Sequence, residues 1–301
     1  MTAIGVHGTS NGFIIGADGR QSVDEVSKSA EPDAAKIRER TDAQKIFPLS
    51  ASDKNIAYAL AGYVINDDPS FDAVQESLKL ADFCRHRDYA NATKLVNGFS
   101  KALTELINQA KHFPEFEKNP DGHWKIMDAF FLGYFKAVPF VTHVDFYHSL
   151  RFAEFHATGL SLAGVFYGSD VVRRKMYDDF GNVVTGSPFA QYIHNPREIY
   201  SLDDSEKYVK GYIEACSSDL GMSMDQSRCK KIGGHIHVAE LTPNGFRWRT
   251  APYFPSIFPD LFPAFIPLSK ILAHCPLSVR EQGANFRREF WRTIQRTISA
   301  E

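Results

Sequence analysis

The chain has 301 residues, of which 44% are hydrophobic and 23% are charged, and its formal net charge at pH 7 is −2. These values predict a soluble globular chain of one large or two modest domains. Nothing in the charge balance points to nucleic acid as a partner, and no apolar stretch approaches the length of a membrane span.

The N-terminal residues are predicted to form a β-hairpin that begins at the first positions of the chain. Residues 2–7 have strand character, residues 8–12 form a glycine-bounded turn, and residues 12–20 form a buried second strand. A second strand pair is predicted at 44–49 and 55–62. Two hairpins therefore open the chain.

Thr2 follows the initiator Met1, so removal of Met1 would leave an α-amino group and a hydroxyl on one residue. The amine has a reference pKa of about 7.7–8.0 and can accept the hydroxyl proton near neutral pH. Thr2 would then be both nucleophile and base. Taken alone, Thr2 is better explained as an ordinary processed N-terminus.

Four short motifs occur in a fixed order on the two hairpins. They are Thr2, the segment Ala-Asp-Gly-Arg-Gln-Ser at 17–22, Lys45-Ile46 and Ala61-Gly62. Together they resemble the β-type subunits of the proteasome and their stand-alone bacterial homologues, which are N-terminal nucleophile hydrolases with a catalytic threonine. This resemblance implies a threonine-type peptidase or amidohydrolase.

The spacing of the motifs agrees with the family at one point and departs from it at another. Asp18 lies 16 positions after Thr2, as in the family. Lys45 lies further from Thr2 than is usual, because residues 23–43 carry a charged insertion. Lys36 would nearly restore the spacing, but residues 31–40 lack strand character, so we assign the catalytic role to Lys45.

The resemblance implies a role for each of these residues. The Thr2 hydroxyl would attack a carbonyl while the Thr2 amine, directly or through a water, accepts its proton. Lys45 would lie beside the hydroxyl as a cation, kept charged and oriented by Asp18. Gly62 would offer its backbone N–H to the oxyanion, where one donor contributes about 2.7–4 kcal/mol. The alternative for these residues is an ordinary ion pair at strand ends and a strand terminator.

The resemblance also implies which residues bind the substrate. Leu60 would form the floor of the pocket for the side chain on the acyl side of the cut, and Ser22 would also contact the substrate. Because an apolar floor cannot satisfy a buried charge, hydrophobic substrate side chains are expected there.

Beyond Gly62 the hydrophobic pattern alternates between helical and strand periods. Helices are predicted at about 71–81, 95–110, 171–178 and 203–220, and strands at 129–134, 140–146, 233–241 and 246–248. The element order is that of an α+β protein, and the resemblance implies a four-layer αββα sandwich of the N-terminal nucleophile hydrolase type. We assign this domain to residues 1–250.

Ser169 and the residues before Gly233 bear on the surroundings of the Thr2 amine. By resemblance, Ser169 would contact the amine, although a serine at this point is also a good helix N-cap. The family usually has an aspartate and a serine just before a Gly-Gly pair, but here Ile232 precedes it and the nearest acids, Asp219 and Asp225, are offset. The shell around the amine is therefore either incomplete or supplied by other residues.

Other candidate sites are weaker. Residues 159–163 only faintly match the nucleophile elbow of α/β hydrolases, since the second glycine is missing. His235 and His237 would share one face of a strand, but no third metal ligand stands at a readable spacing, so packed or rim histidines are expected. The four cysteines also lack metal spacing. We expect no metal, no cofactor and reduced thiols in a cytoplasmic protein.

Residues 251–301 are predicted to be a Pro/Phe-rich extension followed by an amphipathic helix at about 279–298. Prolines recur every four residues from Pro255 to Pro267, which excludes helix and central strand. Because family members work as closed rings, we expect a homo-oligomeric ring, assembled in part through this apolar extension.

The expected function is therefore a proteasome-like threonine peptidase that acts on a peptide or protein substrate after Met1 is removed. Two alternatives remain open at this point: a small-molecule amidase of the same fold, and a catalytically silent structural subunit of a ring.

Overall fold

A computed structural model of the chain describes residues 2–24, 37–41, 43–51, 53–64, 72–109, 125–147, 154–157 and 164–252. The described residues belong to one compact unit, which contains two five-stranded antiparallel sheets together with helices. The prediction of the α+β class is confirmed.

The first sheet has the strand order β10-β1-β2-β11-β12. Its strands are β1 (Ile4–Thr9), β2 (Gly12–Asp18), β10 (Val165–Tyr167), β11 (Ile236–Thr242) and β12 (Gly245–Thr250). β1 and β2 form the hairpin that the sequence predicts at the N-terminus. All of β2 is buried, because both of its faces are covered, which explains its continuous apolar pattern.

The second sheet has the order β5-β6-β7-β8-β9. Its strands are β5 (Ile46–Ala51), β6 (Lys54–Gly62), β7 (Lys125–Phe135), β8 (Val138–Tyr147) and β9 (Glu154–Ala157). A two-residue turn joins β7 to β8, and both of its residues, Lys136 and Ala137, have positive φ angles of 49° and 63°. Such a turn matches the twist of the strands that it connects.

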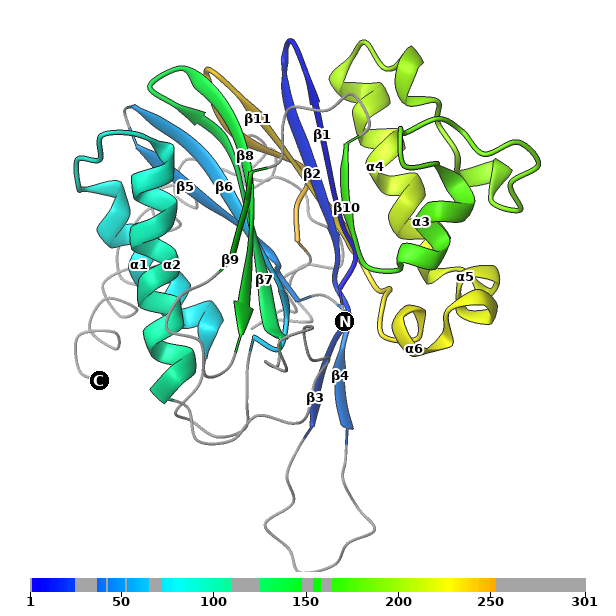
Figure 1. Cartoon of the computed structure of the whole chain (residues 1–301), viewed down its shortest axis with the longest axis horizontal. Helices are drawn as coiled ribbons and strands as arrows, with labels where there is room; N and C mark the ends of the chain where they lie inside the picture. Colours follow the sequence, from blue (N-terminus) through cyan, green and yellow to red (C-terminus); the bar gives the residue numbers. More distant parts are fainter. Residues whose placement is uncertain are drawn as a thin grey trace, which may run out of the picture. The chain divides into compact units, whose positions relative to one another are not determined.

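Helices cover the outer faces of the two sheets (Figure 1). On the second sheet lie α1 (Ala73–Arg85) and α2 (Ala92–Gln109). Beside the first sheet lie α3 (Asp170–Met176), η1 (Ala190–Tyr192), η2 (Pro196–Glu198), α4 (Leu202–Ser217), α5 (Asp219–Met224) and α6 (Gln226–Cys229). One hydrophobic cluster lies under each group of helices, and a third contains residues of both sheets.

The third cluster fills the space between the sheets and determines which side chains face that space. Ile4 and Ile15 of the first sheet meet Ala59 and Phe130 of the second in this cluster. Ala3, by contrast, belongs to the cluster under α4. Successive residues of a strand point to opposite faces, so the even-numbered residues at the start of β1 face the second sheet.

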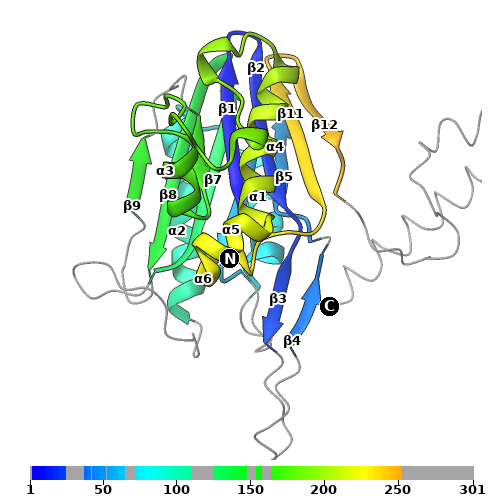
Figure 2. The same cartoon turned by 90° about the vertical axis from the view of Figure 1, so that its right-hand side faces the viewer.

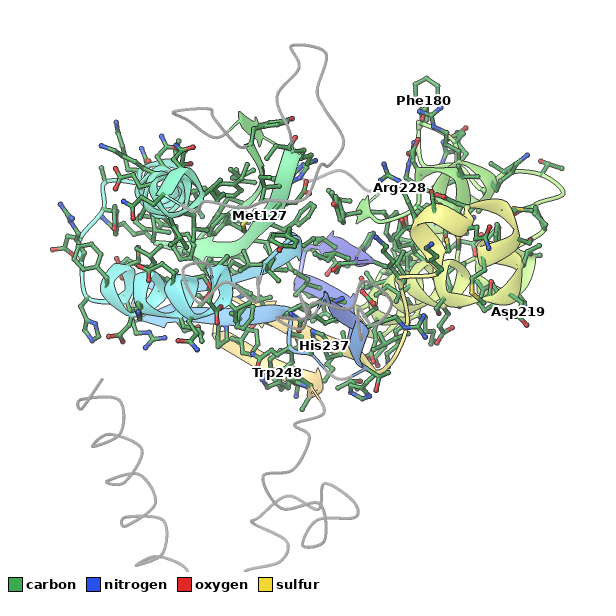
Figure 3. The ribbon with its side chains drawn as sticks, turned by 90° about the horizontal axis from the view of Figure 1, so that it is seen from below. Met127, Phe180, Asp219, Arg228, His237 and Trp248 are labelled. Carbon is green, nitrogen blue, oxygen red and sulfur yellow. The ribbon has the colours of Figure 1, made fainter. Side chains whose placement is uncertain are left out.

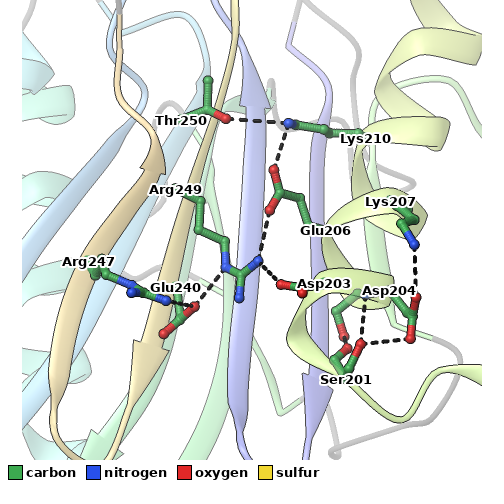
Figure 4. Close-up of polar contacts among 11 residues, drawn as sticks. Ser201, Asp203, Asp204, Glu206, Lys207, Lys210, Glu240, Arg247, Arg249 and Thr250 are labelled. Atoms are coloured by element: carbon green, nitrogen blue, oxygen red, sulfur yellow. Dashed lines mark hydrogen bonds and ion pairs between the residues drawn. The ribbon is translucent and has the colours of Figure 1, made fainter. Parts of the chain in front are cut away.

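Close packing and an ion-pair network hold α4 on the first sheet. A Cβ at Gly16 of β2 would lie 2.7 Å from Val209 Cγ1 of α4, so glycine permits this close approach. At the edge of the sheet, Arg249 of β12 contacts Glu206 at 3.0 Å and Glu240 at 2.7 Å (Figure 4). Apolar packing and ion pairs therefore both hold α4 against the first sheet.

Two details of the sequence prediction are wrong. Residues Ile37–Arg40 form strand β4, which pairs with β3 (Gln21–Asp24) below the sheets (Figure 2); pairing of backbones alone requires no apolar alternation. The helix predicted at 203–220 ends at Ser217, and α5 begins after Ser218. Ser218 caps α5, since its Oγ accepts the N–H of Gly221 at 3.0 Å.

Among the described residues, no helix has the length and apolar character needed to cross a membrane. The predicted extension lies outside the described residues from residue 253 onward, as does the rival motif at 159–163.

Candidate active site

Thr2 lies two residues before β1, and only 4% of its surface is exposed. The pairing of β1 with β2 continues to Ala3, because the Asp18 N–H donates to the Ala3 carbonyl at 3.2 Å. By strand alternation, the Thr2 side chain is on the same face as Ile4, towards the second sheet. The candidate nucleophile thus stands at one end of the space between the sheets.

The Asp18 carboxylate joins several parts of this site. Its Oδ1 accepts the Ala3 N–H at 2.8 Å and the Lys45 Nζ at 2.9 Å. Its Oδ2 accepts the N–H groups of Gly233 at 2.9 Å and Arg20 at 3.2 Å. The side chain is fully buried, and four such donors fix its orientation and stabilise its charge.

Lys45 and the start of β1 are brought together by a shared acceptor atom. The same Asp18 oxygen binds the Lys45 ammonium and the amide of the residue that follows Thr2. The ammonium also donates to the Arg20 carbonyl at 2.7 Å. Two of the predicted catalytic residues, Asp18 and Lys45, are therefore in direct contact. Asp18 also binds the N–H of the peptide bond that joins Thr2 to Ala3.

Burial changes the acid–base chemistry of Lys45. Desolvation lowers the pKa of Lys45 and outweighs the attraction of Asp18, while the nearby positive charge of Arg20 lowers it further. A lysine with a lowered pKa exchanges its proton more easily than an ordinary surface lysine. Perturbed lysines of this kind are frequent in catalytic sites.

Gly62 has a backbone conformation that favours glycine. Its φ angle is +93°, and a Cβ would lie 2.7 Å from the Ile126 carbonyl, so glycine is needed here. The Leu60 N–H donates to the Lys45 carbonyl, whereas the Tyr63 N–H donates to Ile126 on β7. Since N–H groups alternate sides along a strand, the Gly62 N–H points to the side of β6 where Lys45 lies.

Ser169 caps α3 and contacts an aspartate. Its Oγ accepts the Val172 N–H at 3.2 Å and donates to Asp225 Oδ2 at 2.7 Å. The antiparallel register of β1 and β10 pairs Ile4 with Tyr167, and continuing it places Ser169 opposite Thr2. Gly168 supports this placement, since a Cβ there would lie 3.3 Å from Ala3 Cα.

Asp225 is the acidic partner whose role the sequence left unassigned. It caps α6, and its Oδ1 accepts the Ser227 hydroxyl at 2.9 Å. Partial burial raises the pKa of Asp225, but hydrogen bonds from Ser169 and Ser227 outweigh it and lower the pKa. Asp225, one of the two acids that the sequence shows before Gly233, is thus the one that contacts Ser169. An Asp-x-Ser capping pattern was its only local signal.

The remaining predicted residues are placed as follows. Leu60 is buried in the cluster between the second sheet and α1 and α2. Ser22 lies in β3, and its side chain is outside the part of the structure that is described. His235 donates through Nε2 to the Ala251 carbonyl at 2.8 Å. His237 is buried and accepts the Lys45 N–H at 3.1 Å.

A second buried group of charges lies on β7 and β8. Asp128 and Asp145 stand directly opposite each other in the ladder, an arrangement that is unfavourable without a cation. Lys125 Nζ lies 2.6 Å from Asp128 and 2.9 Å from Asp145, and His143 Nε2 lies 2.7 Å and 3.0 Å from the same two carboxylates. Asp128 is also opposite Ala61, so this group neighbours Gly62.

The donor atoms of Asp128, His143 and Asp145 lie within 4.8 Å of one another, close enough to hold a metal ion. The Lys125 ammonium already contacts both carboxylates. Burial lowers the pKa of His143, but its hydrogen bonds to Asp128 and Asp145 raise it to about 8. A protonated His143 and Lys125 together balance the two negative charges, so the group is electrostatically complete as it stands.

A scan against models of protein families finds no match to this chain, and a search of curated proteins finds none either.

Proposed function

We propose that the chain is a threonine-type N-terminal nucleophile hydrolase that cleaves amide bonds after removal of Met1, and that it is similar to the β-type subunits of the proteasome. In this proposal the two sheets and their outer helices form the four-layer αββα sandwich of that class. The hypothesis accounts for a nearly buried Thr2 at the end of the space between the sheets.

The observation that carries the proposal is the double use of Asp18 Oδ1. This oxygen binds both the amide that follows Thr2 and the ammonium of Lys45. An ion pair that only stabilises the ends of two strands does not require a hydrogen bond from the N-terminal backbone. A nucleophile at Thr2, by contrast, is activated by an ionisable group held close to it, and the shared oxygen holds the Lys45 ammonium next to the peptide unit that follows Thr2.

The proposed reaction uses the groups in sequence. The Thr2 Oγ forms a bond to the substrate carbonyl carbon, and the Thr2 amine takes the hydroxyl proton. The Gly62 N–H stabilises the oxyanion. When the C–N bond breaks, the amine passes its proton to the leaving nitrogen, and an ester on Thr2 remains. Water then hydrolyses the ester with the same amine as base.

In this proposal the surrounding residues determine the charge of Lys45 and the orientation of the Thr2 amine. The positive charge of Lys45, held on Asp18 Oδ1, favours the ionised form of the hydroxyl. In this proposal Ser169, whose hydroxyl donates to Asp225, would orient the amine through that hydroxyl. In this account Asp225 supplies the acid that the sequence lacks directly before Gly233.

The direct test is Thr2→Ala against Thr2→Ser in an assay with fluorogenic peptides. We expect Thr2→Ala to lower turnover by at least about a thousandfold, with an unchanged circular dichroism spectrum, and Thr2→Ser to retain activity. Activity in Thr2→Ala would refute the mechanism. Turnover of small amides without peptides would favour the amidase alternative, and an inactive wild type would favour the silent ring subunit.

We propose that the substrate pocket prefers apolar side chains, because the resemblance assigns its floor to Leu60 and an apolar floor cannot satisfy a buried charge. Peptides with leucine or tyrosine before the cleaved bond should turn over faster than those with arginine or glutamate. The opposite order would show that Leu60 does not determine the preference.

We further propose a homo-oligomeric ring. Light scattering on the full chain and on a chain truncated after Thr250 tests this idea. A monomeric full chain would refute the ring, and an unchanged oligomer after truncation would exclude residues 251–301 from the interface.

A further inference from the structure

His237 makes a contact that links the two sheets at the candidate active site. The residue lies on β11 and pairs with Ala17, next to Asp18 on β2. Its Nε2 accepts the N–H of Lys45, which comes just before β5 in the other sheet, at 3.1 Å. One imidazole therefore connects β11, the neighbour of the strand that carries Asp18, to Lys45, which forms the ion pair with Asp18.

The contact replaces a hydrogen bond that the sheet would otherwise supply. The Leu60 N–H donates to the Lys45 carbonyl as in a normal ladder, but the Lys45 N–H turns to His237. The backbone of Lys45 is thus held from two directions. The direction of the Lys45 side chain depends on both contacts, because the side chain starts from the same Cα.

The surroundings keep His237 in the form that accepts a hydrogen bond. It is 1% exposed, and burial together with the charge of Lys45 lowers its pKa to about 3. The imidazole is then neutral at ordinary pH, with Nε2 as the acceptor and the proton assigned to Nδ1. The Trp248 ring packs edge-on against it at 6.1 Å between ring centroids (Figure 3).

We propose that His237 is a positioning residue for Lys45, which it holds in place by accepting the Lys45 N–H. The inference rests on the proposed function, since its effect on the reaction passes through Lys45. A displacement of about 1 Å at a catalytic group can lower the rate about a hundredfold. Loss of this acceptor should therefore lower kcat much more than it changes KM.

The test compares His237→Leu with His237→Gln. Glutamine carries its amide oxygen the same number of bonds from Cβ as Nε2 in histidine, so it can still accept the Lys45 N–H, whereas leucine cannot. We expect His237→Leu to lower kcat by about tenfold or more with nearly unchanged KM, and His237→Gln to recover most of kcat. Melting curves of both variants report any loss of folding.

The matched controls are His235→Leu and His235→Gln, at the residue just before the same strand, where the ring contacts Ala251. Equal loss of kcat in His237→Leu and His237→Gln would overturn the inference. The loss would then be due to removal of the imidazole ring and not to removal of the hydrogen-bond acceptor. A loss in His237→Leu no larger than in His235→Leu would overturn it as well. An inactive wild type, or an active Thr2→Ala, would refute the proposed function and the positioning role together, so the two failures are distinguishable.

Discussion

Two buried lysine–aspartate groups in this chain differ in their balance of charge. The Asp18 group has one carboxylate facing Lys45, with Arg20 close by. The Lys125 group has two carboxylates, Asp128 and Asp145, facing one lysine and one histidine. Positive charge is in excess in the first group, and the charges cancel in the second when its histidine is protonated.

The difference shows in the pKa values. In the Asp18 group, desolvation lowers the pKa of Lys45, and it also lowers that of His237 to about 3. In the Lys125 group, desolvation is outweighed by the aspartates, and the pKa of Lys125 and of His143 is raised. The first environment disfavours the protonated forms of Lys45 and His237, and the second favours the protonated forms of Lys125 and His143, as a structural link needs.

The largest expected effect is that of Asp18→Asn. The substitution leaves the buried Lys45 without a counter-charge, so the free energy of unfolding should fall by about 3–5 kcal/mol. Urea denaturation measures this loss. The matched control is Asp145→Asn, for which we expect a smaller loss, because Asp128 still faces Lys125 and His143. A larger loss in Asp145→Asn would contradict the comparison.

The second prediction concerns alkaline pH. The folded pKa of His143, about 8, is above its unfolded value of 6.5. Protonated His143 therefore contributes stability that is complete below pH 6.5 and is lost as the pH rises through about 8. The contribution is about 2 kcal/mol. Urea denaturation at several pH values should show this loss in wild type, and His143→Gln should remove it.

His237 should give the opposite sign. Its folded pKa of about 3 is below the unfolded value of 6.5, so its contribution to stability is present above pH 6.5 and is lost as the pH falls towards 3. His237→Gln should flatten the acid side of the profile, whereas His143→Gln should flatten the alkaline side. The same slope change in both variants would contradict the distinction between the groups.

Two glycines provide the fourth prediction. Gly62 and Gly133 both have positive φ angles, +93° and +131°, and a Cβ at either would meet backbone atoms. Substitution of either by alanine should cost about 1–3 kcal/mol of stability. Only Gly62→Ala should also lower turnover beyond what its stability loss explains. Equal turnover in the two variants under folded conditions would remove Gly62 from the mechanism.

The smallest effect is expected at the surface, beside the network around Arg249 (Figure 4). The pair Lys207–Asp204 is 3.2 Å long and both side chains are well exposed. Lys207→Ala should therefore change the free energy of unfolding by less than about 1 kcal/mol, and salt should reduce the effect. A loss as large as that of Asp18→Asn would show that burial does not decide the strength of these pairs.

The hairpins and the Asp18–Lys45 contact were predictable from sequence because their signals are local or follow a known order. Strand alternation marked β1, β2, β5 and β6. The motif order selected Lys45, and the structure brings its Nζ to within 2.9 Å of Asp18. Strand β4 escaped prediction because the pairing of two backbones leaves no apolar pattern in the sequence.

The outer contacts of the site could not be predicted, since they join distant parts of the chain. Ser169 and Asp225 are separated by 56 positions, and Lys45 and His237 by 192. Helix capping explains why a serine and an aspartate stand at these helix starts. It does not reveal that the two helix starts meet in space, which depends on how α3 and α6 pack beside the first sheet.

The central claim is that Thr2, with a free amine, is the nucleophile. The most direct measurement is mass spectrometry of the intact chain after treatment with a peptide carrying a threonine-reactive electrophile, followed by mapping of the modified residue. The account predicts a chain that lacks Met1 and carries one adduct, on Thr2, and predicts no adduct in Thr2→Ala. A retained Met1, or an adduct on any other residue in place of Thr2, would contradict it.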